Sequence, residues 1–399
     1  MSDLAAFREQ TRAWLAENCP PGARGPGEVP TGSTKVEVAD ADTRLWLERM
    51  AERGWTVPTW PTAYGGGGLS AEEARVLYDE MAAIDARPPL VNMGTRMLGP
   101  TLLEFGTEAQ KKRHLTRIAQ GRAAWCQGYS EPSAGSDLAN VRTRAEDRGD
   151  EFVINGQKIW TSGAQTADWM FALVRTDPAA PKHQGISFVL LSMDQPGVTV
   201  RPIRLISGSS PFCETFFDDA VASKDDLVGE PNHGWTVGKR LLQHERSGQG
   251  GLGPRSGRSQ PVGVTVDLDP AETALRYLGS EHGRIADAAL RNRVIDFKMA
   301  SKAFGLTQQR AAEENSSGNA PGEATSIFKL YGATLARERQ DLVVALMGFR
   351  GLGWDGDGFS DAEVGAMRSF LASRAVTIYG GTNEVQQNII AKRVLGLPD

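Results

Sequence analysis

The hydrophobic pattern of this chain changes twice, and these changes constrain its fold more than any single motif does. Up to about residue 122, apolar residues such as Leu77, Met81 and Ile84 recur at helical spacing. Short alternating runs separated by Gly, Pro and Asp then predict strands, and helical spacing returns after them. We therefore predict an α+β protein with three parts: an all-α N-terminal domain (1–122), a middle antiparallel β-barrel or sandwich domain (123–232) and a C-terminal α-helical bundle (233–399).

The middle part contains one segment that indicates a hairpin. Residues 151–160 predict a strand, a tight turn at Asn155-Gly156 and a second strand, because Asn-Gly favours the turn type that joins antiparallel strands. Further strands are expected at 169–174, 186–191, 198–203 and 213–217. In the N-terminal part, Ser70 and Glu73 have the spacing of a capping box, which predicts a helix that begins after Ser70.

Composition excludes several classes of protein. The net charge of −5 over 399 residues gives no basic surface for nucleic acid, and no apolar run is long enough to span a membrane. The three cysteines, Cys19, Cys126 and Cys213, are too far apart for a disulfide framework or a metal site. The polar start of the chain does not resemble a signal peptide, so we expect a cytoplasmic protein.

A loop that precedes the predicted strands is dense in turn formers and hydroxyl groups. It runs Tyr129-Ser-Glu-Pro-Ser-Ala-Gly-Ser-Asp-Leu138. Its backbone N–H groups and the hydroxyls of Ser130 and Ser136 can face one ligand. The loop lacks Lys and Arg, so it is a cradle rather than a charged phosphate clamp. Taken alone, such a run is more often an ordinary surface turn.

This loop resembles the signature of the acyl-CoA dehydrogenase family, in which a Ser/Thr-Glu-Pro-x-Ala-Gly-Ser-Asp segment holds FAD and the substrate thioester. The resemblance runs from about Gly54 to the C-terminus and implies the three-domain fold of that family. It implies that Tyr129 and Ser130 contact the flavin, with the Ser130 hydroxyl bonded to its ring. Ser136 corresponds to a hydroxyl near the CoA pyrophosphate, where it serves both FAD and substrate.

The segment Trp160-Thr161-Ser162-Gly163 places an aromatic ring next to hydroxyl groups. Such a pair suits a flavin, because the indole can stack on the ring and a hydroxyl can reach a ring acceptor. A tryptophan on a strand is otherwise more often a core residue. The resemblance implies that Trp160 packs against the isoalloxazine and that Ser162 lies near the reactive nitrogen.

A second motif, Tyr379-Gly380-Gly381-Thr382-Asn383-Glu384, opens a predicted helix. Glycines at a helix N-terminus let an anionic ligand approach closely, although a plain capped helix is the simpler interpretation. The resemblance implies that Thr382 and Glu384 contact FAD and that Gly380 and Gly381 line the substrate site.

Gly380 stands where many members of the family have the glutamate that removes the substrate's α-proton. In a smaller subgroup, which includes the isovaleryl-CoA and long-chain enzymes, the base lies one helix earlier and directly precedes an arginine. Glu245 and Arg246 match that pair, so the resemblance implies Glu245 as base and Arg246 as a substrate contact. An apolar pocket raises the pKa of a carboxyl group, which suits this role. His244 points elsewhere on a helix and is expected to be structural.

The family's Arg-x-x-Phe-Gly segment, which contacts FAD across a subunit interface, does not occur between Glu245 and Arg310. The adenine end of FAD must then be held in another way. Related bacterial enzymes form tetramers of two unlike subunits that share FAD sites, so the resemblance leaves a homotetramer and a heterotetramer open.

The resemblance as a whole implies an FAD-dependent acyl-CoA dehydrogenase that forms a trans-2-enoyl-CoA. An electron-transferring flavoprotein is the expected electron acceptor. Two alternatives remain at this point: a relative with other flavin chemistry on acyl-CoA, such as a desulfinase or an oxygen-using enzyme, and a subunit with a structural role in a mixed tetramer.

Overall fold

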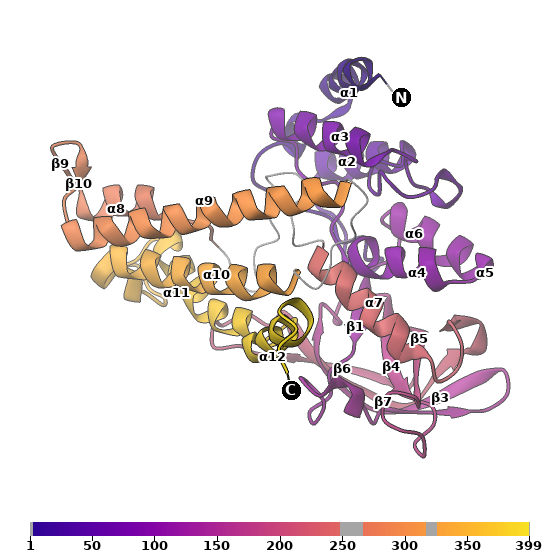
Figure 1. The fold of residues 1–399 in the computed structure, drawn as a ribbon. Coiled ribbons are helices and arrows are strands. Elements are labelled where there is room, and N and C mark those ends of the chain that lie inside the picture. The colour runs from indigo at the N-terminus through magenta and orange to yellow at the C-terminus, as the bar shows by residue number, and fades with distance from the viewer. Residues whose placement is uncertain (1–2, 248–265, 317–324, 399) are drawn as a thin grey trace. The chain divides into compact units, whose positions relative to one another are not determined.

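A computed structural model describes residues 3–247, 266–316 and 325–398 of the chain. The chain divides into two compact units (Figure 1). The first comprises Met1–Ile203 and Phe212–Arg258, and the second comprises Arg204–Pro211 and Ser259–Asp399. The predicted succession of helices, sheet and helices is confirmed, whereas the exact boundaries at residues 122 and 232 stay a prediction.

The first unit opens with helices whose ends are fixed by their own side chains. Asp3 and Asp40 cap two of them by accepting hydrogen bonds from free backbone N–H groups. The capping box of Ser70 and Glu73 is confirmed, with both reciprocal hydrogen bonds present. The helices are α1 (Leu4–Asn18), α2 (Ala41–Glu52), α3 (Ala71–Ala83), α4 (Gly99–Phe105), α5 (Glu108–Gln110) and α6 (Thr116–Ala119), with π-helical turns η3 (Gly94–Leu98) and η4 (Lys111–Leu115).

A buried carboxylate joins α1 to α3. Glu80 is 4% exposed and accepts hydrogen bonds from Arg8 Nη1 (2.6 Å) and Arg12 Nε (2.8 Å). These bonds, that of Arg12 first, hold the pKa of Glu80 below its ordinary value, although burial acts in the opposite direction. The ionised form of Glu80 therefore stabilises the contact between the two helices.

One mixed sheet follows these helices in the first unit. Its main path is β6-β7-β3-β2-β4-β5-β8, and β1 pairs with β4. Most pairs are antiparallel as predicted, but β1 and β2 each run parallel to β4. The strands are β1 (Trp125–Gly128), β2 (Arg144–Asp147), β3 (Glu151–Ser162), β4 (Trp169–Arg175), β5 (Ile186–Ser192), β6 (Val198–Ile203), β7 (Phe212–Ser223) and β8 (Leu227–Val228).

The hairpin predicted at Asn155-Gly156 is wrong, because β3 continues through both residues. The pairing with β7 shifts register between Ile154 and Gly156, which marks a bulge instead of a turn. The Asn155 amide is bound to Asp219 on the neighbouring strand, through Nδ2 (2.8 Å) and through Oδ1, which accepts from the Asp219 N–H (2.9 Å). Asn155 thus stabilises the pairing of β3 with β7, and the local turn propensity of Asn-Gly could not predict this contact.

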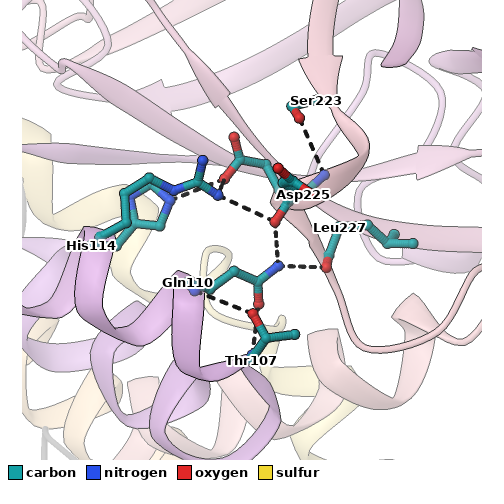
Figure 2. Close-up of polar contacts among 8 residues, drawn as sticks. Thr107, Gln110, His114, Ser223, Asp225 and Leu227 are labelled. Atoms are coloured by element: carbon teal, nitrogen blue, oxygen red, sulfur yellow. Dashed lines mark hydrogen bonds and ion pairs between the residues drawn. The ribbon is translucent and has the colours of Figure 1, made fainter. Parts of the chain in front are cut away.

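The sheet is fastened to the N-terminal helices at β8 (Figure 2). Gln110 Nε2 donates to the carbonyls of Asp225 (2.8 Å) and Leu227 (2.7 Å). The buried His114 ring lies 3.0 Å from Asp226 Oδ1 through Nε2, and Arg113 donates to the same oxygen. These hydrogen bonds satisfy buried polar groups where the helices contact the sheet. They therefore hold the segment 110–114 against the segment 225–227.

The last helix of the first unit, α7 (Gly234–Ser247), packs on the sheet near β5 (Figure 1). In its described residues the second unit consists of helices, connecting loops and a small hairpin, and α10 packs against α8, α9 and α11. Its elements are α8 (Pro270–Leu278), β9 (Ser280–Glu281), β10 (Arg284–Ile285), α9 (Ala288–Ser316), α10 (Thr325–Met347), α11 (Asp361–Ala372), α12 (Asn383–Ile389) and the π-helical η11 (Ile390–Val394). Among the described residues, no helix is both long and apolar enough to cross a membrane.

We expect Glu80→Gln to lower the free energy of unfolding by about 1–2 kcal/mol at pH 7, because the glutamine loses the charge that faces two guanidinium groups. A carboxyl group with a depressed folded pKa contributes stability above its unfolded pKa and loses it as the pH falls through the folded value. The difference between wild type and variant should therefore shrink below about pH 4. Denaturant unfolding at several pH values measures it, and a difference that stays constant on acidification would contradict the assignment.

Candidate functional site

The predicted ligand loop begins directly after β1 and is buried at its start. Tyr129 is 5% exposed, and its hydroxyl donates to the carbonyl of Gly238 in α7 (3.4 Å). A Cβ atom on Gly238 would lie 3.1 Å from Leu173 and 3.4 Å from the Tyr129 hydroxyl. The glycine therefore lets α7 approach the loop closely, so that the start of the loop packs against the helix.

The next residues of the loop are tied to β3, whereas its tip is open. The Ser130 carbonyl accepts a hydrogen bond from the Ile159 N–H (2.9 Å). Nothing lies within 4 Å of a Cβ placed on Gly135, and Ser136 is exposed. The start of the loop is held by β3 and its tip is open, an arrangement that could hold a ligand. Ser130 is therefore half-buried, whereas Ser136 is exposed to solvent.

Trp160 has an unusual backbone on β3. Its φ is +61°, a left-handed conformation that costs a bulky L-residue about 1–2 kcal/mol. The pairing with β7 shifts register between Lys158 and Thr161, so Trp160 lies in a bulge that redirects its side chain. Trp160 is 51% exposed, and its indole meets the ring of Phe212 edge to face. A strained bulge thus presents a large aromatic face instead of burying it.

The two residues after Trp160 face different surroundings. Thr161 is fully buried, and its hydroxyl bonds the Cys213 carbonyl (2.9 Å) and the Thr215 hydroxyl (2.9 Å). Ser162 is half-buried and pairs with Phe212 at the end of the strand. The buried threonine therefore anchors the strand, whereas Ser162 keeps part of its surface exposed two residues after Trp160.

Glu245 extends the buried face of α7. Val237 and Leu241 on that face are buried, and Glu245, half-buried, lies one turn beyond Leu241. Burial raises the pKa of the Tyr129 phenol, and the Glu245 carboxylate adds to this effect. Glu245 therefore lies near enough to influence the start of the ligand loop electrostatically.

The neighbours of Glu245 on α7 have other partners. Arg240 donates to Glu104 on α4, and His244 Nε2 lies 3.0 Å from the same carboxylate. Burial lowers the pKa of His244, although Glu104 acts in the opposite direction. His244 thus has the structural contact that was expected of it. Arg246 lies in α7, but its side chain falls outside the described residues.

The glycine motif of the second unit requires its glycines. Gly380 and Gly381 have φ values of +66° and +90°. A Cβ on Gly381 would lie 2.4 Å from Gln386 Nε2, which itself donates to the Gly380 carbonyl (3.3 Å). Thr382 caps α12 by accepting from the Val385 N–H (3.3 Å), and Glu384 is exposed in the first turn.

In the first unit, the Ser130 loop contacts the strand that carries Trp160 and Ser162 through Ile159, and it contacts the helix that carries Glu245 through Tyr129. Gly380, Gly381, Thr382 and Glu384 form a local group in the second unit. The sequence interpretation missed Lys158, a fully buried lysine that lies in the sequence between the two segments predicted to contact the flavin. The signal was present, because Lys158 occupies an inward position of a strand, and a charged group there needs a buried partner.

In the first unit, the exposed indole on a strained bulge, the half-buried Ser130 and Ser162 and the open loop tip fit a flat, polar-edged ring such as a flavin.

Three family models match successive parts of the chain: acyl-CoA dehydrogenase N-terminal domain (2–122), middle domain (126–220) and C-terminal domain (271–395). The chain is 39% identical to Acyl-CoA dehydrogenase IpdE1 of Mycobacterium tuberculosis (strain ATCC 25618 / H37Rv), across 100% of this chain and 99% of the relative.

Two solved structures are similar over nearly the whole chain. One is named Tcur3481-Tcur3483 steroid ACAD, with a TM-score of 0.74 and 30% identity, across 99% of this chain and 97% of that chain. The other is the ChsE4-ChsE5 complex from Mycobacterium tuberculosis, with a TM-score of 0.72 and 29% identity, across 100% of this chain and 98% of that chain.

Trp160→Gly should separate binding from stability. Glycine relieves the left-handed strain but adds freedom to the unfolded chain, so the stability of the apoprotein should change by no more than about 1 kcal/mol. Loss of the stacking face should weaken FAD binding about 3–10-fold. Flavin-fluorescence titration and thermal unfolding of the apoprotein measure the two effects, with Trp160→Phe as the control that keeps an aromatic ring. Strong destabilisation at unchanged FAD affinity would instead make Trp160 a core residue.

Proposed function

Because this chain belongs to the acyl-CoA dehydrogenase family, we propose that it desaturates an acyl-CoA thioester to a trans-2-enoyl-CoA with Glu245 as the base. The protein is an FAD-dependent oxidoreductase of that family. Bound FAD supplies the acceptor for the hydride that leaves the substrate's β-carbon. The observation that carries the assignment of Glu245 is its place on the buried face of α7, beside the start of the flavin loop.

A carbon-bound α-proton demands a base that is close and poorly hydrated. Glu245 follows Val237 and Leu241 on a helix face that packs into the core, so its carboxylate lies at the edge of apolar surroundings. Such a place raises the affinity of a carboxylate for a proton and limits competition from water. Gly380 has no side chain that could accept the proton, so Glu245 is the base that this chain offers at a family position.

The other site residues divide into a flavin group and a substrate group. Trp160 stacks on the flavin ring, while Ser130 and Ser162 offer hydroxyls to its polar edge. Tyr129 supports this loop from below by its contact with α7. In our proposal Thr382 and Glu384 contact FAD from the second unit. Ser136, Arg246, Gly380 and Gly381 contact the acyl-CoA, and Ser136 also reaches FAD.

The acyl group that we propose is bulky and alicyclic. Gly380 leaves space where other members carry a glutamate side chain, so the pocket can accept a branched or ring-bearing acyl group. One similar structure is named as a steroid ACAD. That name describes the other protein, and it supports our proposal of a ring-bearing acyl group for this chain. A panel of linear, branched and ring-bearing acyl-CoA thioesters, read by anaerobic bleaching of the flavin, tests this choice.

We propose that the protein acts as a tetramer, of one or two kinds of chain, in the reducing cytoplasm. Ile295, Met299 and Leu306 recur at helical spacing on α9 and are 48%, 63% and 52% exposed. An apolar stripe on one helix face favours burial against another chain. A similar structure is named as a complex of two proteins, ChsE4 and ChsE5, which supports the mixed form. An electron-transferring flavoprotein is the proposed electron acceptor.

Met299→Glu should weaken the assembly, because it places a charge in the apolar stripe, which burial would desolvate. Arg293→Glu is the control, since Arg293 is also exposed on α9 but lies away from the stripe. Light scattering at micromolar concentration, alone and after co-expression with an unlike family chain, should show dissociation for Met299→Glu only. A wild-type monomer with full activity would contradict the proposed assembly.

Glu245→Gln should slow flavin reduction by about 10²–10⁴-fold, because glutamine keeps the shape of the side chain but cannot accept the proton. FAD affinity should hardly change, since the lost interaction matters mainly in the transition state. Glu104→Gln, which removes a carboxylate that also contacts α7, is the matched control and should stay within a few-fold of wild type.

Stopped-flow mixing of the enzyme with its best acyl-CoA, without oxygen, measures this rate. Reduction of Glu245→Gln within a few-fold of wild type would refute the base assignment. Product analysis under the same conditions separates the proposal from the other flavin chemistries, because only a dehydrogenase yields an enoyl-CoA without oxygen. Activity of the single purified chain argues against a purely structural subunit.

A further inference from the structure

Lys158 on β3 has no access to solvent, yet all three of its ammonium protons find acceptors. They go to the Tyr129 carbonyl (3.1 Å), to Glu131 Oε1 (2.7 Å) and to the Leu173 carbonyl (2.7 Å). An ammonium group donates three hydrogen bonds and accepts none, so Lys158 is fully satisfied. Its acceptors lie on two segments, the loop that begins at Tyr129 and strand β4, so Lys158 joins both of them to β3.

Glu131, the partner of Lys158, belongs to the flavin loop and is 6% exposed. Besides the lysine, its carboxylate accepts hydrogen bonds from the backbone N–H groups of Arg142 (2.6 Å) and Thr143 (2.9 Å). The backbone of Glu131 also pairs with that of Ala134 across the turn. The loop is thus closed on itself, and its one buried charge faces β3.

The ion pair lies between the two segments that carry the flavin contacts. Ser130 immediately precedes Glu131, and Trp160 follows Lys158 after a single residue. That intervening residue, Ile159, donates its N–H to the Ser130 carbonyl (2.9 Å). Movement of the lysine or of the carboxylate would therefore change the position of Ser130 relative to Trp160.

Stability alone is a weak reason for such a pair, because apolar residues of similar volume often replace a buried ion pair without loss of stability. Removal of a single partner, by contrast, leaves an uncompensated buried charge. Here it would also release the contact between the Ser130 loop and β3. We propose that Lys158 and Glu131 are positioning residues for the flavin, which set the Ser130 loop against the Trp160 bulge. This inference rests on the proposed assignment of Ser130 and Trp160 to the flavin ring.

The charges around Lys158 give the proposal a pH signature. Burial lowers the pKa of Lys158 to about 8, against the effect of Glu131, and Arg175 contributes in the same direction as burial. Burial alone would raise the pKa of Glu131, but Lys158 and the two backbone donors hold it below its ordinary value. As the pH rises through about 8, the folded protein therefore loses the lysine charge while Glu131 stays ionised.

This deprotonation should affect folding and flavin binding in opposite directions. Between about pH 8 and 10.5 the unfolded chain holds more protons on this lysine than the folded chain does, so its contribution to stability rises with pH. The loop, however, loses the ion pair, so FAD affinity should fall over the same range. A purely structural role predicts no fall in affinity.

The test compares three variants of the full protein, with FAD stripped from the holoenzyme and, if required, with its partner chain present. Lys158→Met leaves the carboxylate unpaired and should weaken FAD binding at least about tenfold and shift the visible spectrum of the bound flavin. Glu131→Gln removes the charge but keeps an acceptor oxygen, so its loss should be smaller. Glu80→Gln, a buried carboxylate in another ion pair of the same unit, should lower the thermal midpoint at an FAD dissociation constant within about twofold of wild type.

The pH profile of the FAD dissociation constant decides the question even if Lys158→Met does not fold. Wild type should bind FAD less tightly as the pH rises from 7 to 9, and Glu131→Gln should flatten this dependence. An unchanged profile in Glu131→Gln, or an unchanged dissociation constant in a folded Lys158→Met, would overturn the inference. If Trp160→Gly also leaves the dissociation constant unchanged, the flavin assignment itself fails. If Trp160→Gly weakens binding while the Lys158 and Glu131 variants do not, only the positioning role fails.

Discussion

The backbone of β3 is the constraint on which the first unit depends. This strand pairs with β2 on one side and with β7 on the other, and its inward residues, Phe152, Ile154, Lys158 and Thr161, are buried. Two bulges interrupt its pairing with β7, one at Asn155 and one at Trp160. Each bulge changes the direction of the following side chains, so a single strand both fills the core and presents an aromatic ring outward. The site is therefore a consequence of irregular pairing inside a regular sheet.

The second wall of the site depends on packing rather than on pairing. Helix α7 lies on the sheet through Val237 and Leu241, and Gly238 allows Tyr129 to approach its backbone. Glu245 lies on the same helix face as Val237 and Leu241. The packing of α7 on the sheet therefore also determines how far the Glu245 side chain is buried. Arg240 and His244 of the same helix contact Glu104 on α4. The apolar packing of α7 on the sheet thus helps to place the proposed base.

The order of helices, sheet and helices could be predicted from hydrophobic periodicity, since helix and strand differ in the spacing of their buried residues. The capping box at Ser70 was equally local. The Asn155-Gly156 turn was not predictable, because the outcome depended on Asp219, a partner distant in sequence. Tyr129, Ser130, Trp160 and Ser162 were assigned to the flavin by resemblance, and that assignment stays a prediction. Lys158 was missed because its significance comes from acceptors on the Tyr129–Leu138 loop and on β4, and only the folded chain brings these two segments to β3.

The strained indole and the buried ion pair are physically linked. A left-handed tryptophan persists only where its surroundings leave no relaxed alternative, since the strain would otherwise be released by a small shift of the strand. The residue two positions before it is the one that cannot shift, because Lys158 would lose three hydrogen bonds inside a medium without water. On the other side, Thr161 is bound to Cys213 and Thr215. Trp160 is therefore held between two buried polar anchors, and the free energy of those anchors maintains the exposed ring in its strained conformation.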